Sequence, residues 1–456
     1  MYPVRPETGL FDEPTLRDEA ALPRPAPALR RPPIPAIVQQ HADDALHLRH
    51  VRSVLVRAPH VRLLQLQRLD DRLEAHLDGL AVAGDDGLAR AQAALERLGT
   101  GEVFAALVAA LQAGDQAMQQ RLFALASASP EAWRGVVSAL GWVTPGLLRA
   151  PVRALLASPA PWQRALALEA CRMHRVAPGA ALPAALRDGD AVLRLAGLRA
   201  AGELGRSDLL PLVLSAMDQA LAAGESPLAE AAASAACLLG ERHAAVAVIE
   251  RAAFATPAAC DHLRPLAVQL LDATRARDHL RALARQGAGT PAHLRETIRA
   301  IGWLGDAAMV PWLIERMDDR QQMRVAGEAF TTITGADLAL LDLEQQPPTD
   351  HVSGPNDDPD DDDVALDDDE SLPWPDKARV QQWWQAQAAR FGPGQRWFVG
   401  GPVQPAHLHA VLQTGTQRQR ALAARYQVLL QPGQPLFPIA APVWRQKRLL
   451  AAGLPA

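Results

Sequence analysis

The sequence predicts an all-α protein, a HEAT-like α-solenoid in which helix pairs of about 30–35 residues stack on one another. Of its 456 residues, 49% are apolar, and these are mostly Ala and Leu, while Tyr and Phe number only 2 and 8. Such a composition is typical of closely packed helices rather than of β-sandwiches. Two further observations favour this fold: similar apolar windows recur along the chain, and glycines follow many of them.

The recurring windows set the repeat length. They begin at residues 164, 194, 229, 264, 294 and 324, so successive starts lie 30, 35, 35, 30 and 30 residues apart, and Arg134–Gly141 extends the series one step back. Within residues 191–204 the apolar side chains form two adjacent stripes at helical spacing, which indicates a helix buried over a wide front. A helix pair that cannot bury this surface alone must stack on its neighbours and share their core.

The expected helix ends agree with this period. Ser226 and Pro227 are placed as an N-cap and the first helical residue, and the stretches Leu209–Leu221 and Met309–Met317 are expected to supply the second helix of their pairs. A glycine in the left-handed conformation ends many helices. Such glycines are predicted at Gly205, Gly240, Gly305 and Gly335.

Composition divides the chain into five predicted segments. They are a flexible Pro-rich tail at 1–35, N-terminal capping helices at 36–83, HEAT-like repeats at 84–344, an acidic linker at 345–371 and a small C-terminal domain at 372–456. The capping helices are expected on either side of Pro59.

The linker and the C-terminal domain differ sharply in charge. Ten of the fourteen residues at 357–370 are acidic, and we expect this self-repelling linker to be disordered. The C-terminal domain is expected to be mainly helical and is rich in Trp and Arg, with Asp376 as its only acid. The acidic run therefore fits either an intramolecular tether or lure for a basic partner, or a plain solvated spacer.

The cysteines and the N-terminal residues bear on the cellular compartment of the protein. Cys171, Cys237 and Cys260 lie far apart within helical patterns, which argues against a disulfide framework. The N-terminal residues lack the apolar core of a signal peptide, and no apolar run reaches the ~18 residues that a membrane span requires. We therefore expect a cytoplasmic protein that does not insert into membranes.

No pattern typical of catalysis or metal binding stands out. His47 with His50, and Cys171 with His174, lie one helical turn apart but lack further ligands at a recognised spacing. None of the 13 histidines is followed by Glu, and there is no Gly-rich phosphate loop, nucleophile elbow or catalytic Cys signature. The sequence therefore predicts a non-enzymatic protein with no cofactor and no metal.

Three groups of residues are candidates for an interaction surface, and each also has a simpler interpretation. The charges within Leu69–Gly84 suit either a binding surface or a polar capping helix. The arginines that recur about once per repeat suit either nucleic acid or pairing with the linker and neighbouring carboxylates. The C-terminal Trp and Arg side chains suit either base stacking or a small domain core. The candidates are Asp71, Arg72, Glu74, His76, Asp78, Arg164, Arg194, Arg264, Arg295, Arg324, Trp383, Trp384, Arg418 and Arg420.

Several of these stretches resemble an uncharacterised bacterial family of HEAT-repeat proteins. The resemblance spans about residues 40–450 and is carried by Leu69–Gly84, Ile298–Gly305, Ala326–Gly335, Leu372–Pro375, Trp383 with Trp384, and Thr416–Ala421. It implies the solenoid fold. Because some members of that family are encoded near type VI secretion genes, it also implies a link to that system, but it implies no catalytic residue.

Three functional hypotheses follow. The first is a protein-binding scaffold or adaptor, whose partner would be an effector or another component of a secretion system, because solenoids offer long surfaces for protein binding. The second is a HEAT-like nucleic-acid-binding protein, which a net charge of −5 disfavours. The third is a lyase or maturation factor of the HEAT-like type, which is supported only by the analogy of fold.

Overall fold

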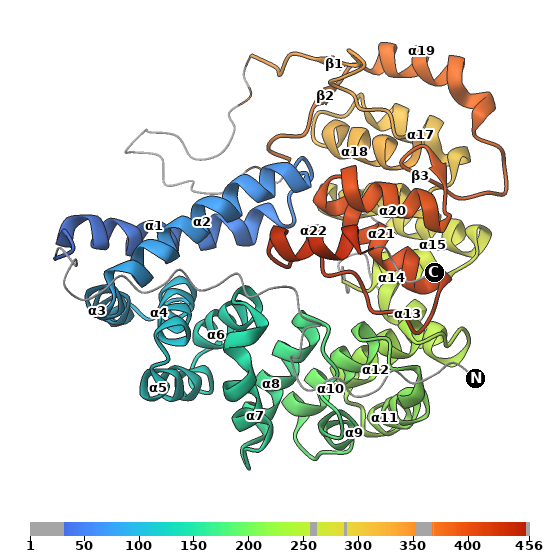
Figure 1. Cartoon of the computed structure of the whole chain (residues 1–456). Coiled ribbons are helices and arrows are strands. Elements are labelled where there is room, and N and C mark those ends of the chain that lie inside the picture. The colour runs from blue at the N-terminus through green and yellow to red at the C-terminus, as the bar shows by residue number, and fades with distance from the viewer. Residues whose placement is uncertain are drawn as a thin grey trace. The chain divides into compact units, whose positions relative to one another are not determined.

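The computed structural model describes residues 32–255, 262–286, 290–349, 351, 367 and 369–452. These residues form 22 α-helices, several short 3-10 turns and four strands of two residues each, which confirms the all-α prediction (Figure 1). Among them, no helix combines the length and the apolar character that crossing a membrane requires. Residues 1–31 of the predicted tail, and Cys260, lie outside the described residues.

Two compact units share the chain. The first comprises residues 1–56, 64–216 and 440–456, and the second comprises residues 57–63 and 217–439. The helices of the first unit are α1 (Pro35–Leu55), α2 (Leu63–Ala83), α3 (Asp85–Ala93), α4 (Thr100–Ala113), α5 (Gln116–Ala126), α6 (Pro130–Trp142), α7 (Arg149–Leu156), α8 (Pro161–His174), α9 (Ala181–Leu186), α10 (Ala191–Glu203) and α22 (Val443–Ala451). The division falls within α11 (Leu210–Ala223).

The second unit contains seven helices from the predicted repeats and three from the C-terminal part of the chain. They are α12 (Ser226–Leu238), α13 (Ala244–Ala253), α14 (Arg264–Leu270), α15 (Ala273–Gln286), α16 (Pro291–Leu304), α17 (Val310–Arg316), α18 (Met323–Thr334), α19 (Lys377–Gln387), α20 (Pro405–Thr414) and α21 (Gln417–Leu430). Two antiparallel pairs of strands accompany them: β1 (Glu344–Gln345) with β2 (Trp374–Pro375), and β3 (Trp397–Phe398) with β4 (Gly401–Pro402).

Every recurring window of the sequence begins in a helix. The windows that start at 164, 194, 229, 264, 294 and 324 begin in α8, α10, α12, α14, α16 and α18, and Arg134–Gly141 lies in α6. The window at 264–275 is interrupted, because α14 ends at Leu270 and α15 begins at Ala273. Ser226 is the first residue of α12 rather than its N-cap, which is Glu225. The predicted glycines Gly205, Gly240, Gly305 and Gly335 all have positive φ, between 67° and 107°.

Window helices pack on one another in succession within each unit. In the first unit α6 contacts α8 and α8 contacts α10, and in the second α14 contacts α16 and α16 contacts α18. Small residues make the approach close: a Cβ added to Gly302 on α16 would lie 2.9 Å from the Cα of Ala329 on α18. Around this contact Ile298, Ile301 and Phe330 are almost fully buried, so the wide apolar front expected from the sequence forms the core.

The chain after α19 satisfies carbonyl groups at the ends of the window helices. Trp397 N–H donates to Gly305 O (2.8 Å), Val399 N–H to Thr332 O (2.7 Å), and Arg396 to Val268 O (2.7 Å). The last carbonyls of a helix have no partner within the helix and need donors from elsewhere. Residues 396–400 supply those donors to α14, α16 and α18.

The sequence predicted a separate C-terminal domain at 372–456. This capping explains why these residues instead pack with the window helices. Residues 372–439 belong to the second unit, where α21 packs on α12 and α14, and residues 440–456 belong to the first unit. Figure 1 shows α20 and α21, in red, alongside the window helices of the second unit. The abundance of Trp and Arg after residue 372 does not mark a domain boundary, because these side chains and the nearby backbone groups complete the cores and helix ends of the two units.

The two ends of the predicted acidic linker lie side by side. Its residues 350, 352–366 and 368 lie outside the described residues, but Gln345 pairs with Trp374 in the β1–β2 ladder, and Asp376 N–H donates to Leu343 O (2.8 Å). The chain therefore returns after residue 369 to the place that it left at residue 345.

Candidate functional site

The arginines that recur once per repeat do not form an exposed basic row. Arg164 forms an ion pair with Asp188 (2.9 Å). Arg264 is fully buried and donates from Nε to Ala253 O (3.2 Å), so its prediction as a surface residue was wrong: it satisfies a carbonyl at the end of α13. Arg194 lies half-buried on α10.

The two remaining arginines of this series hold carboxylates of the acidic segment. Arg295 on α16 donates from both terminal nitrogens to the two oxygens of Asp369, and Arg324 on α18 forms an ion pair with Asp367 (2.6 Å). Arg324 also donates to the backbone O of Asp369 (3.1 Å). We call Arg295 and Arg324 the arginine pair. They come together because they occupy similar places in successive windows and because α16 packs on α18.

Aromatic side chains complete the site. The guanidinium carbon of Arg324 lies 4.5 Å from the centre of the Trp374 ring, a cation–π contact. The ring of His351 stands edge-on to the same tryptophan, at 4.7 Å between centroids, and its Nε2 lies 3.6 Å from Asp367. Trp374 is buried and belongs to β2, which pairs with β1.

Burial makes these contacts stronger than ordinary surface ion pairs. The Asp369 side chain is only 5% exposed, and those of Arg295 and Arg324 are 14% and 10% exposed. Burial by itself raises the pKa of Asp367, but the backbone N–H of Asp369 and the Arg324 guanidinium outweigh this effect and hold that pKa below its usual value. Charge-assisted, two-pronged bonds of this kind give geometric selectivity for carboxylates.

The chemistry of the arginine pair is therefore recognition of two closely spaced acids in a turn. The Glu370 N–H donates to Asp367 O and the Leu372 N–H donates to Asp369 O, both at 2.9 Å, so two successive turns hold the carboxylates at the arginines. Sequence reasoning singled out both arginines and named the linker as one possible partner, but it did not identify the two aspartates. The sequence there is an unbroken run of four acids at 367–370, which gives no signal that singles out Asp367 and Asp369.

The charged block of α2 divides into exposed and buried members. Asp71, Arg72, Glu74 and Asp78 are exposed, as expected of a binding surface or a polar capping helix alike. His76 is half-buried, with its Nδ1 3.1 Å from Nδ1 of His41 on α1 and 3.6 Å from the Asp44 carboxylate.

The C-terminal candidates are engaged in packing within the second unit. Trp383 stands edge-on to buried Phe330, and Trp384 lies against Phe391, so both rings pack against the core. Arg418 forms an ion pair with Glu328 (2.8 Å). Arg420 is fully buried, which lowers its pKa to about 10; its Nε donates to Leu412 O (2.7 Å), so its prediction as a surface residue was wrong.

The positions of these residues bear on the nucleic-acid-binding and enzymatic hypotheses. Arg164, Arg295, Arg324 and Arg418 each have a carboxylate partner, which removes the net positive charge that phosphate binding uses. Cys171 and Cys237 are buried, and burial raises the pKa of each thiol to about 12. In the described part of the chain, no group of three His, Cys, Asp or Glu side chains is placed to hold a metal ion.

Comparison with known proteins adds no further constraint. No model of a protein family matches this chain, and neither does any curated protein or any solved structure. The resemblance to bacterial HEAT-repeat proteins, with its secretion context, therefore stays a prediction.

Proposed function

We propose that this chain is a non-enzymatic protein-binding scaffold built as a HEAT-like solenoid, and that its arginine pair binds closely spaced acidic side chains of a partner segment. One observation carries the proposal: Arg295 and Arg324 already hold Asp369 and Asp367 of the chain's own acidic segment. The succession of packed window helices supports the solenoid. A partner from a type VI secretion system, such as an effector, fits this role if it presents such a segment.

The chain's own segment defines what a partner must offer. It presents two carboxylates two residues apart, and the first lies 3.6 Å from Nε2 of His351, whose ring stands edge-on to Trp374. Because the segment is tethered, its effective concentration at the arginine pair is high, on the order of millimolar for a short flexible connection. An acidic partner segment must compete with it, so the segment acts as a built-in competitor that sets the threshold for binding.

The test removes this competitor while leaving the arginine pair intact. In the double variant Asp367→Asn with Asp369→Asn, binding of a fluorescein-labelled peptide with the sequence of residues 367–375 is measured by fluorescence anisotropy. We expect the double variant to bind this peptide at least ~10-fold more tightly than the unaltered chain, because intramolecular competition is reduced. A peptide with Asn at positions 367 and 369 serves as the ligand control.

Two further variants decide whether the arginine pair is responsible. Adding Arg295→Ala and Arg324→Ala to the double variant is expected to abolish binding, whereas adding Arg281→Ala is expected to leave it unchanged. Arg281 forms only an exposed pair with Asp278, at 3.7 Å in the same unit, so it controls for the loss of positive charge. Failure of the folded double variant to bind the acidic peptide would overturn the proposal.

A further inference from the structure

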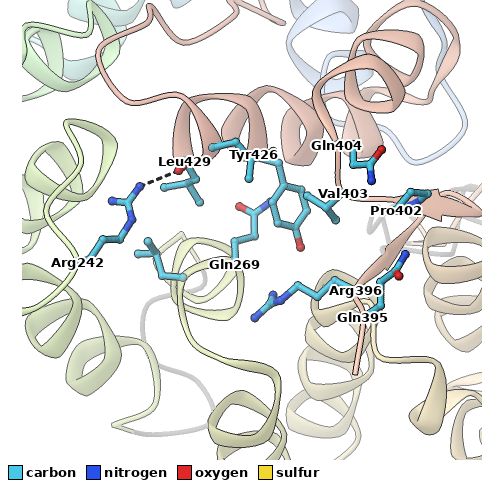
Figure 2. Close-up of a pocket in the computed structure, with 11 residues that line it drawn as sticks. Arg242, Gln269, Gln395, Arg396, Pro402, Val403, Gln404, Tyr426 and Leu429 are labelled. Carbon is cyan, nitrogen blue, oxygen red and sulfur yellow. Dashed lines mark hydrogen bonds between the residues drawn. The ribbon is translucent and has the colours of Figure 1, made fainter. Parts of the chain in front are cut away.

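A second positively charged site lies in the second unit, at a cavity of about 430 Å³. Its walls come from the end of α12, the end of α14, the segment around β3 and β4, and α21. Figure 2 shows Arg242 at one side of the cavity, Gln269 and Tyr426 in its middle, and Val403 and Gln404 beyond them. The volume lies within the range of sites that hold small molecules.

The charge of this cavity is not balanced by acids. Its lining includes Arg242 and Arg396 and no Asp or Glu. The nearest carboxylate in sequence, Glu241, accepts bonds from the backbone N–H groups of residues 243–245 and thereby caps α13. Within the described residues neither arginine has an acidic partner, in contrast to Arg164, Arg295, Arg324 and Arg418.

Carbonyl groups solvate these guanidinium groups without neutralising them. Arg242 donates to Cys237 O (2.6 Å) and Leu429 O (2.8 Å), and Arg396 donates to Val268 O (2.7 Å) and to Leu271 O. Each guanidinium has five N–H donors, so these bonds leave capacity for a ligand. The helix ends hold the two cations at fixed positions facing one cavity, which preorganises them for an anion.

Behind the lining lies a third cation. Arg425 donates from Nη1 to Gln269 Oε1 (3.2 Å), and burial lowers its pKa to about 10, so it stays charged at neutral pH. Tyr426 donates its O–H to Trp303 O (3.1 Å), and burial raises the pKa of its phenol, which therefore stays neutral. Arg425 is half-buried and has no acidic partner among the described residues, so its charge also favours an anion in the cavity.

The rest of the lining is apolar. Leu270, Val403, Leu429 and Leu430 lie around the cavity beside the polar groups. We propose that this cavity binds a small organic anion, with one carboxylate or phosphate group held between Arg242 and Arg396 and a short apolar part against the leucines. The site is independent of the arginine pair, so it is tested separately from the proposed scaffold function.

The experiment measures binding of three probes to the full chain by isothermal titration calorimetry and by thermal unfolding. Benzoate, phenyl phosphate and inorganic phosphate are each compared with sodium chloride at equal ionic strength. Binding of benzoate or phenyl phosphate with a dissociation constant below ~1 mM is expected, and the difference between them identifies the preferred acid group. Absence of binding by all three, beyond the effect of salt, would overturn the proposal.

Variants at the rim locate the binding without removing any helix cap. Leu430 lines the cavity and is 46% exposed, so a polar side chain is tolerated there. Leu430→Glu places a negative charge at the cavity, whereas Leu430→Gln has nearly the same shape without the charge. Affinity of the Glu variant is expected to fall at least ~10-fold below that of the Gln variant, which is the scale of one charge-assisted bond. Equal affinity of the two variants would show that the anion binds elsewhere and would equally overturn the proposal.

Discussion

Arg52 on α1 and Asp70 on α2 form a two-pronged ion pair inside the first unit. Arg52 Nε lies 2.7 Å from Asp70 Oδ1 and its Nη2 lies 3.2 Å from Oδ2, while Asp70 Oδ2 also accepts a bond from the Val443 N–H (2.8 Å). Arg52 in turn donates to the carbonyls of Ala440 and Ala441, both at 3.0 Å. One carboxylate thus joins the two N-terminal helices to the start of α22.

Replacing Asp70 is expected to destabilise the first unit strongly. Asp70→Ala leaves the Arg52 charge, whose side chain is 13% exposed, without its counter-ion, and leaves the Val443 N–H without its acceptor. Removing one partner of such a pair costs about 3–5 kcal/mol. Urea unfolding followed by circular dichroism measures the change. Asp208→Ala is the control, because Asp208 pairs with Arg206 near the surface and is expected to contribute less than ~1 kcal/mol.

His174 is expected to make stability fall in mildly acidic solution. Burial, together with the charges of Arg445 and Arg448, lowers the pKa of His174 to about 3, while its Nε2 lies 2.7 Å from Leu140 O. The unfolded chain takes up this proton near pH 6.5 and the folded chain does not, so the contribution is complete above pH 6.5 and is lost as the pH falls toward 3. Between pH 7.5 and pH 5 the loss is about 2 kcal/mol.

The variant His174→Gln isolates this effect. Glutamine keeps a donor for Leu140 O but has no proton to gain, so the free energy of unfolding of this variant is expected to depend less on pH than that of the unaltered chain. Urea unfolding at pH 7.5, 6 and 5 measures both chains. If the free energies of unfolding of the two proteins change equally with pH, His174 is not the source of the pH dependence.

The periodic part of the fold could be predicted from the sequence because its signals are local. Apolar stripes and the glycines Gly205, Gly240, Gly305 and Gly335 depend only on residues within one or two turns, and they located the window helices and the ends of α10, α12, α16 and α18. Asp70 lies in the same helix as Asp71 and Asp78, and amphipathic reasoning treats all three alike. Its partner Val443 is 373 positions away, and a periodic sequence pattern carries no information about such a long-range contact.

The candidate sites were predicted only in part for the same reason. Arg295 and Arg324 stood out because they recur with the repeat, but their aspartate partners lie in a loop without periodicity. The anion cavity was missed altogether. Its arginines, Arg242 and Arg396, lie 154 positions apart in the chain. The sequence around each of them has no feature that distinguishes it from an ordinary polar loop residue.

Gly335 is expected to be far less replaceable than Gly224, although both end a helix with φ near 70°. A Cβ at position 335 would lie 2.7 Å from the carbonyl carbon of Val399, whereas nothing lies within 4 Å of one at position 224. Gly224→Ala should therefore cost only the left-handed conformation, about 1 kcal/mol, and Gly335→Ala should cost at least about 3 kcal/mol because it also displaces the strand that caps α18. Thermal unfolding of the two variants measures the difference, and similar midpoints would contradict the close contact.

Arg324→Gln is expected to loosen the acidic segment without unfolding its surroundings. The variant loses the ion pair to Asp367 and the stacking on Trp374, while the β1–β2 pairing and α18 retain their backbone hydrogen bonds. Hydrogen–deuterium exchange of peptides that cover residues 369–376 should become ~10-fold faster, which corresponds to about 1.4 kcal/mol of lost local stability. Peptides from α14 should exchange as before, and Arg281→Gln should change neither region. If residues 369–376 keep their protection in Arg324→Gln, the strand pair alone holds the segment, and its carboxylates do not compete for the arginine pair.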